Sequence, residues 1–331
     1  MKNSLFLLGA AAVVALSSCT KNEVLDVAES RAISFNGTGI DNITRNDITS
    51  TGFNQFNVYG GYGENAVFNK VNVSGGTGAW TYSPTQYWAI GSWNFAGYAG
   101  GDGVTPAWDN ASGKLTLEVN SAADKQSDVV FAKNQGIKIT KDNIATYSDQ
   151  VSLNFTHILS KIQFKFTKDV KTLGGVTVKL ANFKVDGLTT NAKWVDGTQG
   201  VAGTPTTGAY TDFLSDEDFT SAKEVTSADG LSTAEFYVIP QTIGTFAITA
   251  NAIITDANGS TIKTGKVTAN VPTTGITAWV AQNKYVYKAE LTYENIVSPD
   301  PEKDPKPIVF EGSTVDWIYD ITTKPVEPNN Q

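Results

Sequence analysis

The chain has 331 residues, of which 40% are hydrophobic and 18% are charged, and its formal net charge is −8. The length predicts about two domains, and the negative charge disfavours a nucleic-acid partner, because phosphate binding needs clustered cations. One His, one Cys and one Met exclude a Cys/His zinc site and a disulfide framework, so we expect no metal and no cofactor.

Residues 1–19 have the pattern of a bacterial export signal. Lys2 supplies a short positive region, and residues 5–16 form an apolar run that is too short for a membrane span of about 20 residues. Leu16-Ser17-Ser18-Cys19 follows with the form of a lipobox. The pattern predicts lipidation at Cys19 and anchoring to a membrane by lipid. The alternative is an ordinary secretory signal that happens to contain a cysteine.

Beyond a polar tether at residues 20–30, apolar side chains recur with period two, which is typical of β-strands. Residues 151–159 carry them at odd positions and residues 162–166 at even positions, so we expect one long strand with a bulge or bend near Ser160 and Lys161. Another one-sided strand is predicted over residues 246–254, and Asn258-Gly259 then predicts a hairpin turn. The class is all-β, with sandwiches as the expected architecture.

The same pass along the chain predicts its division into segments. Gly174-Gly175 restarts the alternation, and residues 298–307 are rich in Pro and charge, which is typical of an extended linker. The predicted order is a signal peptide (1–19), an N-terminal propeptide with the first strand (20–45), an N-terminal β-sandwich (46–170), a C-terminal β-sandwich (171–297), a Pro-rich linker (298–307) and a C-terminal strand segment (308–331).

The arginines are confined to the N-terminal segment. Arg31 and Arg45 are the only two in the chain, and all cations after residue 45 are lysines. An Arg-specific protease would therefore find no site beyond Arg45. Chance depletion of Arg in an organism that favours Lys explains the same composition.

Taken together, several short segments resemble the fimbrillin family, the subunits of Bacteroidetes-type pili. Their order and spacing carry the resemblance, which covers most of the chain. They are the lipobox at Cys19, Ala32-Ile33-Ser34-Phe35, Thr44-Arg45, Phe53-Asn54-Gln55-Phe56-Asn57-Val58-Tyr59, Trp80-Thr81-Tyr82-Ser83-Pro84, Tyr87-Trp88, Asp128-Val129-Val130-Phe131-Ala132, Phe155-Thr156-His157-Ile158-Leu159-Ser160-Lys161-Ile162, Phe236-Tyr237-Val238-Ile239-Pro240-Gln241, Ile308-Val309-Phe310 and Val315-Asp316-Trp317.

The resemblance implies two tandem transthyretin-like or Ig-like β-sandwich domains and assembly by strand exchange. In the family, lipidated precursors reach the outer membrane, an Arg-specific protease removes the first strand, and a neighbouring subunit supplies a replacement. Here the removable strand would be residues 32–37, with Ile33 and Phe35 as its apolar plugs. Arg45 is the expected cleavage site, because cleavage after Arg31 would leave this strand attached.

The candidate donor strand lies near the end of the sequence. Val315, Trp317, Tyr319 and Ile321 alternate with other residues beyond the Pro-rich linker, a pattern that suits insertion into an apolar groove. The alternative is that residues 308–317 form the last strand of the C-terminal domain.

The leading hypothesis is a structural pilus subunit without catalysis, exposed at the cell surface and supporting adhesion. Its expected partners are other pilin subunits, the export and Arg-specific processing proteases, the outer membrane through lipid, and a host or glycan ligand. The alternative is a monomeric surface lipoprotein that binds glycans or host ligands through aromatics near Trp88. The single histidine, His157, is expected in the core rather than in a catalytic or metal site.

Overall fold

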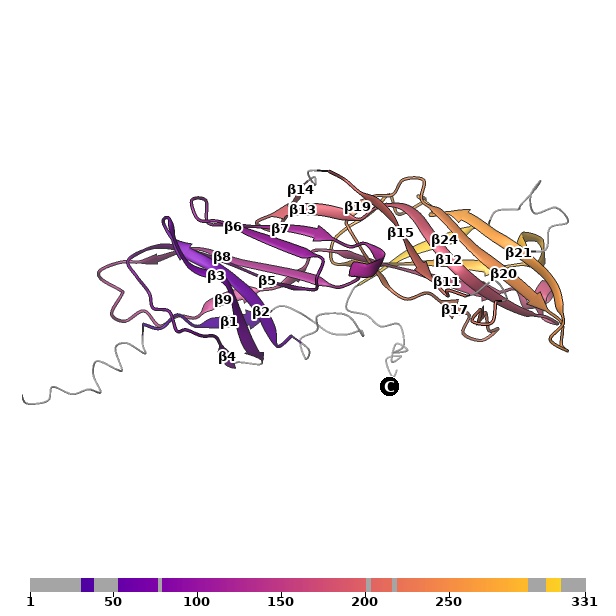
Figure 1. Cartoon of the computed structure of the whole chain (residues 1–331), viewed down its shortest axis with the longest axis horizontal. Coiled ribbons are helices and arrows are strands. Elements are labelled where there is room, and N and C mark those ends of the chain that lie inside the picture. Colours follow the sequence, from indigo (N-terminus) through magenta and orange to yellow (C-terminus); the bar gives the residue numbers. More distant parts are fainter. Residues whose placement is uncertain are drawn as a thin grey trace, which may run out of the picture.

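The computed structural model describes residues 31–38, 53–76, 79–200, 204–215, 219–296 and 308–316. Their regular structure is nearly all β-strand, which confirms the all-β class; α2 (Val170–Leu173) and α3 (Tyr293–Ile296) have four residues each, and η1 (Ala123–Lys125) is a single 3₁₀ turn. No helix among these residues is long and apolar enough to cross a bilayer. The molecule is elongated, with the first strands at one end and most later strands at the other (Figure 1).

A six-stranded sheet forms the centre of the N-terminal half. Its order is β10-β8-β5-β2-β3-β4. The strands are β2 (Gln55–Tyr62), β3 (Asn65–Gly76), β4 (Ala79–Thr81), β5 (Gly91–Gly100), β8 (Val129–Ile139) and β10 (Thr156–His157). Because side chains of a strand alternate between faces, Trp93 and Phe95 of β5 pack on one face, and Ala96 and Tyr98 on the other.

Each face of this central sheet is covered by a different layer. One face packs against a two-stranded parallel sheet of β1 (Phe35–Thr38) and β9 (Val151–Asn154). The other face packs against a four-stranded sheet, β14-β13-β7-β6. Its strands are β6 (Val104–Asp109), β7 (Lys114–Asn120), β13 (Asn191–Val195) and β14 (Thr198–Gly200). The N-terminal half therefore has three layers and two apolar cores.

The C-terminal half is a two-sheet sandwich around one core. The first sheet has the strand order β17-β11-β23-β24, and β18 also pairs with β11. The second sheet has the strand order β15-β12-β20-β21, and β16 also pairs with β12. The strands are β11 (Ser160–Lys168), β12 (Thr177–Thr189), β15 (Thr207–Asp212), β16 (Lys223–Glu224), β17 (Leu231–Ser232), β18 (Phe236–Val238), β20 (Ala247–Thr255), β21 (Thr261–Asn270), β23 (Asn283–Leu291) and β24 (Phe310–Asp316), with β19 (Gln241–Thr242) and β22 (Ala278–Trp279) forming a separate pair.

The long bulged strand predicted around Ser160 is wrong. The segment instead forms β9, β10 and β11, which belong to three different sheets. Its apolar side chains enter the three cores in turn: Val151, Leu153 and Phe155 the first, Ile158 and Leu159 the second, and Ile162, Phe164 and Phe166 the third. The change of parity marks the passage of the chain between sheets. The domain boundary near residue 170 stays a prediction.

The two halves share backbone pairing as well as side-chain contacts. β13 follows β12 of the C-terminal sandwich in sequence, yet it pairs with β7 of the N-terminal half from Asn191↔Asn120 to Val195↔Thr116. The amide of Gln126 accepts a hydrogen bond from the Tyr237 backbone N–H at 2.7 Å and donates to the Tyr237 carbonyl at 3.2 Å. These bonds tie the residue that follows η1 in one half to β18 in the other.

A buried ion network lies beside this junction. The Lys161 ammonium, whose residue is 1% exposed, lies 2.9 Å from Oε2 of Glu235, and Lys284 binds Oε1 of the same carboxylate. Burial would raise the pKa of Glu235, but the charge of Lys161 and hydrogen bonds from both lysines outweigh it and hold the pKa below its usual 4.5. The carboxylate is therefore ionised at neutral pH, which compensates two buried cations.

Candidate functional site

Part of the segment before Arg45, around Ile33 and Phe35, lies inside a fold core. Ile33 and Phe35 are 2% and 1% exposed and belong to the same apolar cluster as Trp93, Phe95 and Leu153. We call the surface that this segment covers the β1 groove. Its walls comprise Phe53, Phe56, Phe68, Trp80, Tyr82, Phe95, Val151 and Leu153. The predicted plugs Ile33 and Phe35 thus fill the core from β1 and the residues just before it.

Phe35 occupies a pocket built from aromatic rings. Its ring meets those of Phe68, Tyr82, Phe95 and Phe56 edge-on, with centroid separations of 5.3, 5.4, 5.8 and 6.3 Å. Edge-to-face pairs at such distances are favourable because the positive ring edge meets the negative face. The pocket is therefore shaped for a flat aromatic side chain.

The backbone of this segment is held on two sides. On one side β1 pairs in parallel with β9, from Phe35↔Val151 to Thr38↔Asn154, and the carbonyls of Ser34 and Thr38 accept from the Val151 and Phe155 N–H groups at 2.8 and 2.7 Å. This pairing satisfies backbone groups that would otherwise be buried without partners.

On the other side the chain just before β1 pairs with the segment that leads into β5. The Arg31 carbonyl accepts from the Trp88 N–H at 3.0 Å, and the Ile33 N–H donates to the Gln86 carbonyl at 2.8 Å. The Tyr82 hydroxyl donates to the Ile33 carbonyl at 2.7 Å. Burial raises the pKa of Tyr82 above its usual 10.0, although a hydrogen bond with Gln86 lowers it, so the hydroxyl keeps the proton that it donates.

The C-terminal strand β24 belongs to the sheet of its own chain. It pairs antiparallel with β23 from Ala289↔Phe310 to Asn283↔Asp316 and forms the edge of that sheet. Val315 pairs with Lys284 and is half-buried, so it is part of the last strand of the C-terminal sandwich in this structure. The other candidate donor residues Trp317, Tyr319 and Ile321 lie outside the described residues, as do Cys19 and Arg45.

The aromatics near Trp88 that suggested glycan binding form a block over residues 80–98, and most of this block is interior. Trp88, Trp93, Phe95 and Tyr98 are at most 4% exposed, and only Tyr87 of the block is as much as 47% exposed. Stacking on a sugar requires an accessible ring face, so these buried side chains serve the core instead. His157 is also largely buried, and its Nδ1 lies 2.8 Å from a carboxylate oxygen of Asp128. No three His, Cys, Asp or Glu side chains of the described residues converge on a metal site.

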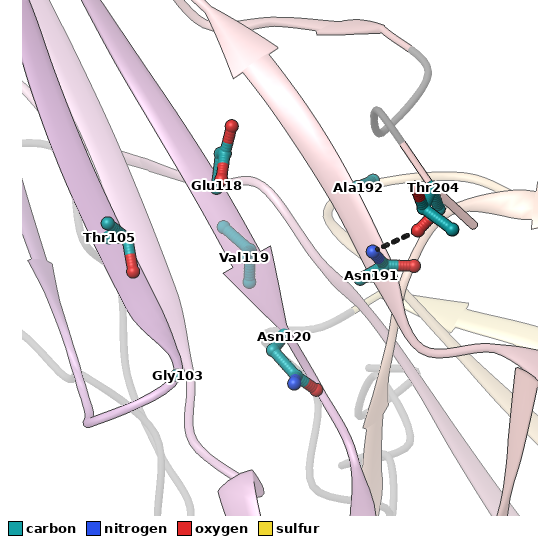
Figure 2. A pocket seen from close by; sticks show the side chains of 8 residues that line it. All are labelled: Gly103, Thr105, Glu118, Val119, Asn120, Asn191, Ala192 and Thr204. Atoms are coloured by element: carbon teal, nitrogen blue, oxygen red, sulfur yellow. Dashed lines mark hydrogen bonds between the residues drawn. The ribbon is translucent and has the colours of Figure 1, made fainter. Parts of the chain in front are cut away.

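A polar hollow of about 400 Å³ lies on the sheet shared by the two halves. Thr105, Glu118, Asn120 and Asn191 line it from β6, β7 and β13, together with Gly103, Val119, Ala192 and Thr204 (Figure 2). The one hydrogen bond drawn among these eight residues runs from Asn191 Nδ2 to the Thr204 carbonyl at 2.9 Å (Figure 2). The lining carries no aromatic ring and a single charge, so it offers neither a stacking platform nor an acid–base pair.

The fold and the site define a class of protein: tandem β-sandwiches in which a strand from the N-terminal segment fills the first core. The fimbrillin-like family profile matches residues 41–316, and the chain belongs to this family, which confirms the resemblance noted in the sequence. The family is one of fimbrial proteins and adhesins at the cell surface rather than of enzymes, and membership supports a pilus-subunit role.

One solved structure supports the fold. A fimbrial protein from Bacteroides vulgatus is similar with 17% identity and a TM-score of 0.62, over 87% of this chain and 99% of that chain. The tip fimbrial protein Mfa3 from Porphyromonas gingivalis matches with 10% identity and a TM-score of 0.37, over 80% of this chain and 94% of that chain. No curated protein has a significant match to the sequence.

Several features of the site were missed in the sequence. The sequence pattern places Tyr82 only in an aromatic block, although its hydroxyl binds the Ile33 carbonyl, and it does not indicate β9 as the partner of β1. Gly37 was included in the removable strand without a role, yet it lies against a wall of aromatic rings. The alternation Ile33, Phe35, Gly37 is the signal that could have identified it.

Proposed function

We propose that this chain is a pilus subunit that is exported as a lipoprotein, cleaved after Arg45, stripped of β1 and polymerised by accepting a strand from a neighbouring subunit. The observation that carries the proposal is that β1 fills an aromatic core from a segment that one cut between β1 and β2 would disconnect. A short strand that contributes core contacts, and whose connection to the next strand can be cleaved, is suited to exchange with a strand from another subunit.

The backbone around Arg31 disfavours cleavage at that arginine. The Arg31 carbonyl and the Ile33 N–H are both engaged in hydrogen bonds with the chain at Gln86–Trp88. The Arg31–Ala32 bond therefore lies within paired backbone, whereas proteolysis concentrates in segments free of such pairing. Arg45 lies in the connection from β1 to β2, where a cut separates β1 from the rest.

The driving force for polymerisation is the groove that β1 leaves. Its loss would expose the rings around Phe35 and leave the β9 backbone without a partner on that side, which makes an edge ready to pair with another chain. An incoming strand restores the hydrogen bonds through its backbone and fills the pockets with alternate side chains. The uncleaved subunit is protected from premature assembly because its own strand already occupies the groove.

The segment after β24 is the candidate donor of this chain. Val315 is engaged with β23, so the part available for donation would begin with Trp317 and include Tyr319 and Ile321. Lipidation at Cys19 would hold the precursor at the outer membrane until cleavage removes residues 1–45. The partners of this proposal are other pilin subunits and the processing proteases, and it needs no cofactor.

The test compares Arg45→Ala with the matched variant Arg31→Ala in cells that assemble the pilus. We expect Arg45→Ala to remain full-length and lipidated and to be missing from surface polymers, while Arg31→Ala is processed normally and its mature N-terminus is Asn46. N-terminal sequencing and detergent-resistant ladders on gels measure both. Normal polymers containing uncut Arg45→Ala would refute the proposal.

A further inference from the structure

We propose that the β1 groove selects an incoming strand by three alternate positions, a large aliphatic residue, an aromatic residue and a glycine, and that this strand comes from a subunit other than a second copy of this chain. The inference rests on the proposed strand exchange and adds the chemistry of the partner. It is drawn from the side-chain sites that Ile33, Phe35 and Gly37 occupy.

The first two positions demand bulk. Ile33 and Phe35 are 2% and 1% exposed, and Phe35 is surrounded edge-on by the rings of Phe68, Tyr82 and Phe95 at 5.3–5.8 Å. A smaller residue in either position would leave a cavity, whose lining loses its contacts. An aliphatic residue followed at the second position by an aromatic one therefore fits the groove best.

The third position favours a glycine, because a side chain there meets aromatic rings at close range. A β-carbon added to Gly37 would lie 3.1 Å from the Phe56 ring and 3.2 Å from the rings of Phe53 and Trp80. These rings support one another, because the centroids of Phe53 and Trp80 are 5.4 Å apart and those of Phe56 and Trp80 are 5.0 Å apart. The ring of Phe155 packs against both phenylalanines, with centroid distances of 4.8 and 5.0 Å. A β-carbon at this position requires these rings to shift by a few tenths of an ångström, and a larger side chain overpacks them.

The chain uses the same spacing a second time, in the strand that completes its other sandwich. Ile308 and Phe310 are each 4% exposed, and a β-carbon on Gly312 would lie 2.9 Å from Ile276 and from Tyr287. Residues 308–312 thus repeat the order of residues 33–37, with Ile, Phe and Gly at alternate positions. Two segments that complete different cores thus carry the same alternate residues. This repetition supports the inference that a strand needs these residues to complete a sandwich core.

The candidate donor segment of this chain does not satisfy the rule. Residues 317–331 contain no glycine and no alanine. In any register and in either direction, a strand from this segment that reached the Gly37 site would place a larger side chain against the aromatic wall. In the matching segment, residues 308–312, Ile308 and Phe310 are already buried in their own sandwich, where β24 pairs with β23. Donor and acceptor of one chain therefore do not match, which points to a different subunit as the neighbour on the groove side.

Peptide exchange tests this inference on the full chain after cutting with an Arg-specific endoprotease. A fluorescent peptide of residues 31–40 is expected to enter the groove in place of the cleaved strand. The same peptide with Gly37→Val is expected to bind at least about tenfold more weakly, a typical consequence of overpacking a buried contact. A peptide of residues 315–325 is expected to bind no better than the Gly37→Val peptide, and the cut protein alone is expected to form no polymer.

The outcomes separate the two proposals. Failure of the native peptide to exchange would contradict strand replacement itself and so the proposed function. Exchange of the native peptide together with equal affinity of the Gly37→Val peptide would leave strand replacement standing and overturn the glycine rule. Tight binding of residues 315–325, or a ladder formed by the cut protein alone, would overturn the assignment of the neighbour to a different subunit.

Discussion

Phe35→Ala is the substitution that most directly probes how β1 is retained. The ring is 1% exposed and makes edge contacts with four other rings. Removing a buried Phe side chain typically costs about 3–5 kcal/mol, because transfer free energy is lost and a cavity remains. The neighbouring rings form a mutually supporting cluster that cannot collapse freely, so we expect about 4 kcal/mol for this site.

In the intact chain this loss lowers the free energy of unfolding of the N-terminal half. After cleavage at Arg45 the same loss falls on the affinity of the severed strand. Since every 1.4 kcal/mol changes an equilibrium constant tenfold, the strand should be held on the order of 10³-fold more weakly. Size-exclusion chromatography after Arg-specific cleavage, with mass spectrometry of the retained N-terminal peptide, measures this difference.

The matched control is Phe310→Ala in β24. Phe310 is 4% exposed and meets the rings of Phe164 and Phe166 edge-on at 5.7 Å. Its removal should cost a similar free energy of unfolding, about 3–5 kcal/mol, but in the C-terminal core, so the cleaved N-terminal strand should stay bound as in the wild type. Retention of the strand by Phe35→Ala equal to that in Phe310→Ala would refute the reasoning.

Two further predictions concern the junction between the halves. Glu235→Gln leaves the buried cations of Lys161 and Lys284 without a charge partner and should destabilise the chain by about 3 kcal/mol, the lower end of the usual range because the Glu235 side chain is 19% exposed. The pKa of Glu235 is lower in the folded chain than its unfolded value near 4.5. The stability that the carboxylate contributes is therefore fully present above pH 4.5 and is lost as the pH falls through the folded pKa. The urea midpoints of wild type and variant should differ at pH 7 and converge in acid. Gln126→Ala removes both hydrogen bonds to Tyr237 and should cost about 1–3 kcal/mol, measured by thermal unfolding; an unchanged midpoint would show that the bridge does not stabilise the junction.

The alternation of apolar residues was sufficient to predict a strand and its buried face where that strand packs into a single core. The hairpin predicted around Asn258-Gly259 is the turn between β20 and β21, and Gly259 has φ of 83°, which a glycine adopts without strain. The removable strand predicted over residues 32–37 lies in the core through Ile33 and Phe35. Alternation with period two records which side chains face inward, and the core confirms those faces.

The same alternation did not predict where the chain passes from one sheet to another. Residues 151–166 alternate in the same way whether they form one bulged strand or three strands in three sheets, because alternation reports a buried face and not the sheet to which it belongs. For the same reason the sequence offered no sign that β13 would leave its own sandwich to pair with β7, or that Tyr82 would hold the Ile33 carbonyl.

The amino-acid sequence by itself determined the all-β class, the family, the inward faces of the strands and the two arginines between which β1 lies, since these depend on residue type and spacing along the chain. Only the tertiary structure decided that β1 pairs in parallel with β9, that the N-terminal half has three layers, and that Gly37 is pressed against an aromatic wall. Those features arise from contacts between segments far apart in the sequence, and no local spacing specifies which distant surface a buried face will meet.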